Sequence, residues 1–220
     1  MTTILTGTEI RVLGSLVEKQ VTTPEYYPLT LNALTLACSQ KNNRNPVTAY
    51  SETDVANALE SLREKNLAYV FYGSTSRVPK YKHVMTEVLH LSPAELAVLC
   101  VLMLRGSQTT GEIRGNAARL HEFASLEEVE ATVNSLISRE PDRLVVRLPR
   151  QPGQKEVRFA HLLSGEPDIE AMVLPETFSA SRRKTSDSER VEKLEQDVLS
   201  LTSQIEQLQR QFEEFKKQFE

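Results

Sequence analysis

The sequence of 220 residues has no tryptophan, only two cysteines and no apolar run near the ~20 residues that a membrane-spanning helix needs. We therefore expect no membrane-spanning segment and no membrane partner. The first residues lack the basic start and apolar core of a secretory signal, which predicts a cytoplasmic location. Cys38 and Cys100 lie inside apolar stretches without a CxxC motif or clustered histidines, which is typical of a reducing compartment and argues against a metal site.

The usual sequence patterns of catalytic sites are also missing. The motifs GxSxG, HExxH, GxxxxGK[ST] and GxGxxG do not occur. None of the four histidines has a second one at the i, i+4 spacing that would place two metal ligands on one helix face. They are His83, His90, His121 and His161. We predict a protein that is not an enzyme and holds neither a cofactor nor a metal.

The most informative feature that is present is an internal repeat. The segment TGTEIRVLGSL (residues 6–16) matches SPAELAVLCVL (92–102), and both begin with a capping box of Ser or Thr followed by Glu three residues later. The segment SETDVANALESL (51–62) matches SLEEVEATVNSL (125–136), and both have apolar residues at i, i+4 and i+7. This spacing predicts amphipathic helices, each burying one face.

A hairpin is predicted after each helix of the second matched pair, that is, after residues 51–62 and after residues 125–136, because the apolar period changes there from 3.6 to 2. Another short helix is expected near residues 30–39 and 110–120. Each copy is then three helices followed by a β-hairpin, which is the winged-helix form of the helix-turn-helix. The predicted fold class is mainly α with small β-hairpins (α+β), and the predicted winged-helix domains are residues 1–88 and 89–165.

The C-terminal part has a different pattern. Residues 166–186 mix Ser, Pro and charge without periodicity and predict a linker. Residues 187–220 have apolar residues at alternating spacings of 3 and 4, which predicts a coiled coil. Its seam is Val191, Leu194, Val198, Leu201, Ile205, Leu208, Phe212, Phe215 and Phe219. The β-branched residues at a and leucines at d favour a parallel homodimer, whereas the three bulky Phe residues could favour another order or a foreign partner.

Charge is distributed unevenly over these elements, although the whole chain has a net charge of −4. The third helices are acidic: residues 51–66 have a net charge of −2 and residues 125–140 of −3. The hairpins are basic, with +3 over residues 67–84 and +4 over residues 143–161. Phosphates would repel an acidic helix in the major groove, so any nucleic-acid contact is predicted at the hairpins and a basic loop.

The predicted nucleic-acid contacts are Lys41, Arg44, Arg77, Lys80, Lys82, Arg147, Arg150, Lys155 and Arg158. Tyr72 and Tyr81 are available beside them to pack or to form hydrogen bonds. Two alternatives stay open at this point. Charged hairpins are often solvated edges that deter strand addition, and the acidic helices fit a protein partner equally well.

The segments EKQVTTPEYYPLTLNAL, TTGEIRGNAAR and VVRLPRQPGQKEVRFAHLLSG resemble the YceH family of bacterial proteins. The resemblance covers roughly residues 6–165 and is weaker in the predicted coil. It implies a bacterial cytoplasmic protein with two winged-helix domains, and it implies no ligand and no catalytic residue.

We predict a non-enzymatic binding protein, a DNA-associated regulator that contacts DNA through its basic wings. Such a homodimer would carry four winged helices that each bind DNA weakly, and their high effective concentration would raise the overall affinity for DNA. The alternative is a protein-protein interaction scaffold that uses its winged helices and coiled coil without binding DNA. Fold analogy alone does not decide between these functions.

Overall fold

The computed structural model describes residues 4–72, 78–150 and 156–167. These residues form an α+β arrangement of seven α-helices and two small antiparallel sheets, in agreement with the predicted fold class. They belong to one compact unit, residues 1–169, whereas residues 170–220 form a separate unit. The predicted coiled coil and its seam therefore lie outside the described residues, as does most of the predicted linker. No helix in the described ranges is long and apolar enough to cross a membrane.

The first half of the unit contains the three predicted helices and the predicted hairpin. Its elements are α1 (Gly7–Thr22), the 3-10 turn η1 (Pro24–Tyr26), β1 (Leu29–Thr30), α2 (Leu31–Cys38), α3 (Glu52–Glu64), β2 (Ala68–Phe71) and β3 (Lys80–His83). The predicted capping box at Thr6 and Glu9 starts α1, and a second box at Ser51 and Asp54 starts α3. The strand β1, which the sequence pattern does not reveal, pairs with β3 and completes a three-stranded sheet.

The second half repeats this order after the short helix α4 (Met85–Val88). Its elements are α5 (Pro93–Arg105), α6 (Thr110–Ala117), α7 (Leu126–Ile137), β4 (Val145–Arg147) and β5 (Phe159–His161). The predicted capping box at Ser92 and Glu95 starts α5, and Ser125 caps α7. The succession of three helices and a strand pair, predicted twice, is confirmed for both halves.

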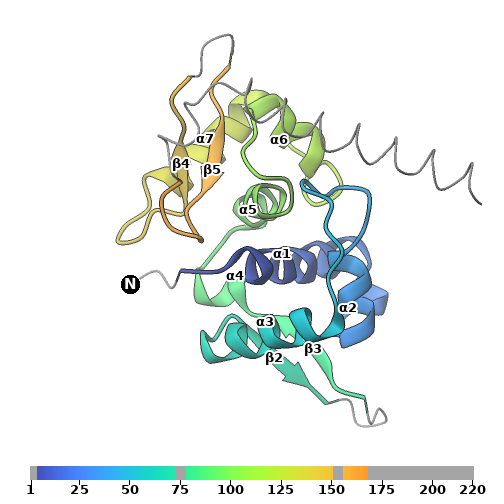
Figure 1. Cartoon of the computed structure of the whole chain (residues 1–220). Helices are drawn as coiled ribbons and strands as arrows, with labels where there is room; N and C mark the ends of the chain where they lie inside the picture. Colours follow the sequence, from blue (N-terminus) through green and yellow to red (C-terminus); the bar gives the residue numbers. More distant parts are fainter. Residues whose placement is uncertain (1–3, 73–77, 151–155, 168–220) are drawn as a thin grey trace, which may run out of the picture. The chain divides into compact units, whose positions relative to one another are not determined.

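The two halves pack directly on each other through their first helices. Figure 1 shows α1 and α5 side by side at the centre, with β2 and β3 at one end and β4 and β5 at the other. Gly14 allows the close approach, because a Cβ atom there would lie 2.9 Å from the Cδ2 of Leu104. This contact and the other helices of each half together bury residues 9–18 of α1 and 96–104 of α5. One apolar core runs through both halves, and both hairpins project from it.

Candidate nucleic-acid interface

The outer face of the β2–β3 hairpin combines aromatic and basic side chains. Tyr69 and Phe71 lie on the same face of β2 because side chains alternate along a strand, and they are 37% and 43% exposed. Across the antiparallel pair, Tyr69 is opposite Lys82 and Phe71 is opposite Lys80. The Nζ of Lys82 lies 5.3 Å from the centre of the Tyr69 ring. We call Tyr69, Phe71, Lys80 and Lys82 the aromatic-basic face.

The inner face of the same hairpin fixes its position on the core. Ala68 and His83 are buried, and Tyr81 packs partly buried against the core. The amide of His83 donates a hydrogen bond to the hydroxyl of Tyr27 at 2.8 Å, and its Nδ1 accepts one from the amide of Met85 at 3.3 Å. Burial lowers the pKa of His83 to about 4, so its ring is neutral near pH 7.

The two tyrosines that the sequence suggested beside the contacts have different environments. Tyr72 is 71% exposed just beyond the end of β2 and is available, as expected. Tyr81 belongs to the inner face and supports the hairpin rather than its outer surface. The aromatic residues that the hairpin does present, Tyr69 and Phe71, were missed. The alternation of LAYVFY against PKYKH contains the signal, because it places both rings on the lysine face.

The second hairpin has two exposed arginines and a third that is held by the protein itself. Arg147 is exposed on β4, and its guanidinium carbon lies 5.7 Å from the centre of the Phe159 ring. Arg150, which follows β4 in the chain, is also exposed. Arg158, in contrast, donates to the carbonyl of Ser107 at 2.7 Å and to Glu112 at 2.9 Å. It therefore ties the hairpin to the start of α6, and only part of its charge faces solvent.

A groove of about 440 Å³ separates this second hairpin from α7 and the start of α6. Its lining combines both signs of charge with apolar surface. The lining residues are Thr110, Gly111, Leu126, Glu130, Asn134, Arg147, Arg150, Glu156, Val157 and Phe159. The two carboxylates offset the two guanidinium groups, so the groove is less suited to phosphate than the aromatic-basic face of the first hairpin.

Arg44 is not a surface contact, and its prediction as one was wrong. The residue is 5% exposed and makes two hydrogen bonds to the carboxylate of Glu18, at 2.7 and 3.1 Å. It also donates to the carbonyl of Ala37 at 2.9 Å and to the side chain of Gln40 at 3.0 Å. A buried cation needs such partners because desolvation is costly. Arg44 therefore anchors the loop of residues 39–50 from inside.

A second buried arginine fixes the same loop. Arg11 of α1 donates to the carbonyl of Pro46 at 2.6 Å and lies over the ring of Tyr50. The loop also reaches the second half, because the amide of Asn45 donates to the carbonyl of Leu104. Lys41 is exposed in this loop and keeps its place among the candidate contacts. The candidates Arg77 and Lys155 lie outside the described residues.

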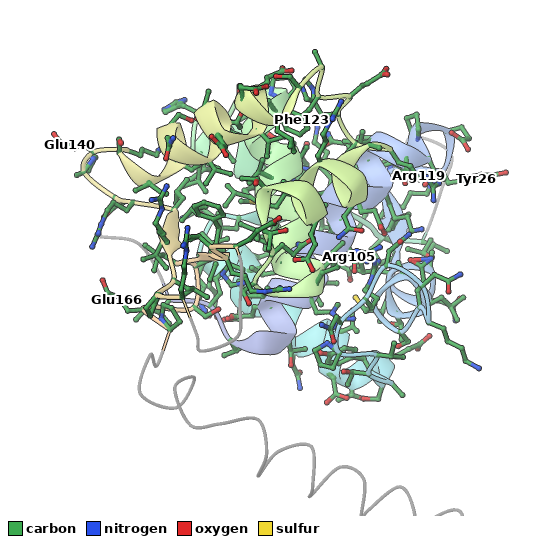
Figure 2. The ribbon with its side chains drawn as sticks, turned by 90° about the horizontal axis from the view of Figure 1, so that it is seen from above. Tyr26, Arg105, Arg119, Phe123, Glu140 and Glu166 are labelled. Carbon is green, nitrogen blue, oxygen red and sulfur yellow. The ribbon has the colours of Figure 1, made fainter. Side chains whose placement is uncertain are left out.

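Further exposed side chains lie outside the hairpins, on η1 and just after α6. Figure 2 shows Tyr26 pointing away from the unit, and its side chain is 72% exposed. Arg105 and Arg119, also labelled there, line a cavity of about 230 Å³ together with Asn43. Arg105 is held by a hydrogen bond to the Asn43 side chain, whereas Arg119 is exposed.

A cavity of about 350 Å³ lies where the two halves meet, and it is lined by Lys65 and Arg139 from equivalent positions after α3 and α7. Both cations already have partners within the protein. Lys65 donates to Glu9 at 2.6 Å, and Arg139 donates to the carbonyl of Leu89. Burial acts to raise the pKa of Glu9, but hydrogen bonds from Lys65, Ser61 and Thr6 outweigh it and lower the pKa to about 2. In each half, this cation therefore links the end of the third helix to residues near the start of that half.

Among the described residues, both cysteines are buried. The described part of the chain contains no group of three or more His, Cys, Asp or Glu that could hold a metal ion. Burial raises the pKa of both thiols, Cys38 and Cys100, which keeps them protonated. Burial also lowers the pKa of His161 to about 4.

Comparison with known proteins places this geometry among proteins with no assigned activity. A family model described as "Protein of unknown function, DUF480" matches residues 5–154. A UPF0502 protein of Citrifermentans bemidjiense is 52% identical over 198 residues, covering 90% of each chain. One from Geobacter sulfurreducens is 50% identical over 202 residues, covering 91% of each. One from Pelobacter propionicus is 51% identical over 224 residues and covers all of both chains.

Proposed function

Because this chain belongs to the DUF480 (UPF0502) family of bacterial proteins, whose description assigns no activity, we propose a function from its own geometry. We propose that it is a non-enzymatic, DNA-associated regulator in which two tandem winged helices contact nucleic acid through their hairpins. The repeated order of three helices and a hairpin supports the winged-helix assignment. The resemblance to the YceH family is consistent with this fold.

The observation that carries the proposal is the separation of charge between hairpin and helix. Lys80 and Lys82 lie on the outer face of the first hairpin, whose described residues include no carboxylate. The outward positions of α3 are mostly acidic, with Glu52, Asp54 and Glu60 exposed. Phosphates attract the first surface and repel the second, so the hairpin is the part of this half that can approach a nucleic acid.

The test is fluorescence anisotropy of a labelled random-sequence duplex with the full chain over a series of salt concentrations. We expect binding at about 50 mM salt that weakens steeply as salt rises, because phosphate contacts release counterions. The variant Lys80→Ala with Lys82→Ala should flatten the slope of log K against log salt by about 1.8, since each phosphate contact contributes about 0.9.

The matched control is Arg63→Ala with Arg119→Ala, which removes the same charge from exposed positions outside the hairpins. This control should leave the slope within about a few tenths of the wild-type value, because neither residue is proposed to contact phosphate. An equal loss in both double variants would show that overall charge, and not the hairpin, determines binding. That result would contradict the proposal.

Dimerisation through residues 187–220 forms part of the proposal and rests on the heptad pattern of the sequence. Two copies would present four hairpins, so contacts that are weak individually would add through effective concentration. A chain that ends at Ser186 should be monomeric by light scattering and should bind the duplex more weakly than the full chain. Equal affinity of both chains would show that the coil contributes nothing to binding.

A protein-docking scaffold is the second candidate function, and one observation favours it. The groove beside α7 is lined by Leu126, which is exposed although apolar, together with Glu130 and Asn134 from the same helix. Exposed apolar side chains with surrounding charge suit a protein partner. If the full chain binds no nucleic acid at about 50 mM salt, the regulator is ruled out and the scaffold takes its place.

A further inference from the structure

The aromatic side chains of the first hairpin point to a more specific ligand than duplex DNA. We propose that the aromatic-basic face binds single-stranded nucleic acid, with bases stacked on Tyr69 and Phe71 and phosphates held by Lys80 and Lys82. This inference rests on the proposed nucleic-acid function and names the form of nucleic acid that this surface takes.

The geometry provides two stacking positions beside two cations. Tyr69 and Phe71 are two residues apart on one strand, so their Cα atoms are separated by about 6.6 Å. Each ring has a lysine directly across the antiparallel pair. Bases in one strand of a duplex follow each other at about 3.4 Å, which is too close for neighbouring bases to cover both rings. A strand whose bases are unstacked and spread apart can cover them.

An intact duplex would leave these rings without a function. Its base faces are covered by neighbouring base pairs, so a protein reaches only phosphates and base edges. Lysines alone would provide the phosphate contacts. Aromatic rings gain instead from stacking on an exposed base, which is how sequence-tolerant single-strand binders obtain much of their affinity. The exposure of Tyr69 and Phe71 is therefore explained by a ligand that offers π-faces.

Lys82 shows how the face is occupied before a ligand binds. Its ammonium group lies 5.3 Å from the centre of the Tyr69 ring, where it makes a cation–π contact. A base that stacks on Tyr69 displaces this ammonium, which can then reach the phosphate of the same nucleotide. The inner face cannot take part, because Ala68, His83 and Tyr81 pack toward the core.

The experiment compares a labelled 15-nucleotide single strand with the duplex of the same sequence, by anisotropy with the full chain. The variant Tyr69→Leu with Phe71→Leu keeps apolar side chains but removes both π-faces. It should weaken single-strand binding at least tenfold, because each stacked base contributes substantially to affinity. Duplex binding should change less than twofold. The control Tyr26→Leu removes a tyrosine of η1 that is 72% exposed and lies outside the hairpin, and it should leave both affinities unchanged.

A second readout separates stacking from loss of structure. A single strand that contains 2-aminopurine changes its fluorescence when that base stacks on an aromatic ring. We expect this change with the wild-type chain and with Lys80→Ala, at a higher protein concentration for the latter. It should be absent with Tyr69→Leu and Phe71→Leu, whose thermal unfolding should stay close to that of the wild type because both side chains are exposed.

The outcomes distinguish this inference from the proposed function. One outcome is that the duplex binds with a salt slope that depends on Lys80 and Lys82, whereas the single strand binds no more tightly than the duplex. If the substitutions Tyr69→Leu and Phe71→Leu also leave single-strand affinity unchanged, base stacking is refuted and the proposed regulator function stands. If neither nucleic acid binds at about 50 mM salt, both proposals fail. The aromatic-basic face would then belong to a protein interface.

Discussion

Replacing Arg44 by Ala should destabilise the protein strongly, because Arg44 is an internal anchor. Its side chain is fully buried and forms an ion pair with Glu18 at 2.7 Å. The substitution leaves the largely buried Glu18 carboxylate without its hydrogen-bonded cation, so that only Lys19 remains nearby, at 3.9 Å. It also removes the hydrogen bonds that Arg44 donates to the carbonyl of Ala37 in α2 and to the side chain of Gln40 within the loop. Breaking a buried ion pair from one side costs about 3–5 kcal/mol.

This magnitude can be measured by urea unfolding followed by circular dichroism. Thermal unfolding provides a second check. For a unit of this size, each 1 kcal/mol lost from the free energy of unfolding lowers the thermal midpoint by roughly 2–4 °C, so Arg44→Ala should lower it by roughly 6–20 °C. The control Lys41→Ala changes an exposed residue of the same loop and should stay within about 0.5 kcal/mol of the wild type. The reasoning would be refuted if Arg44→Ala kept wild-type stability and weakened nucleic-acid binding more than Lys41→Ala did.

Three further predictions follow from burial and close packing. Gly14→Ala should lower the free energy of unfolding by about 1–2 kcal/mol through overpacking against α5, whereas Gly115→Ala, whose Cβ would meet open space, should raise it by about 0.5–1 kcal/mol. Urea unfolding checks both signs. The pKa values of His83 and His161, about 4 against an ordinary 6.5, mean that the unfolded chain binds more protons between these values. Stability should therefore fall as pH drops from 6.5 to 4, and His161→Leu should reduce the fall in urea midpoint between pH 7 and pH 5. The pKa of Glu9, about 2, predicts a contribution that is complete above pH 4.5 and is lost as pH falls toward 2. Glu9→Gln should lower stability more at pH 5 than at pH 3, and an equal loss at both would contradict the lowered pKa.

The repeated architecture was predictable because its determinants are local. Capping residues such as Ser51 and Ser92 satisfy helix ends within three residues, and the change of apolar period marks each hairpin. The packing of α1 on α5 was not predictable, because both helices are buried by a partner that lies far along the chain. Gly14 shows the reason: its close contact with Leu104 depends on the fold and leaves no local pattern.

The candidate site was predicted only in part for the same reason. The basic character of the first hairpin is a property of composition, and the structure places Lys80 and Lys82 on its outer face. Arg44 sits in the polar stretch KNNRNPV, which is typical of a solvated loop, and its burial depends on Glu18 of a distant helix. Register was the missing information for Tyr69 and Phe71, since it decides which residues share the lysine face.

Whether the first hairpin, rather than α3, meets nucleic acid is tested most directly by photocrosslinking. The full chain would be irradiated with a single strand that carries a photoreactive base, and the modified peptides would be identified by mass spectrometry. We predict crosslinks at Tyr69 and Phe71, with loss of the signal in Lys80→Ala with Lys82→Ala. Crosslinks on the outer face of α3, at positions such as Asn57, with none on the hairpin would contradict the proposed mode of binding.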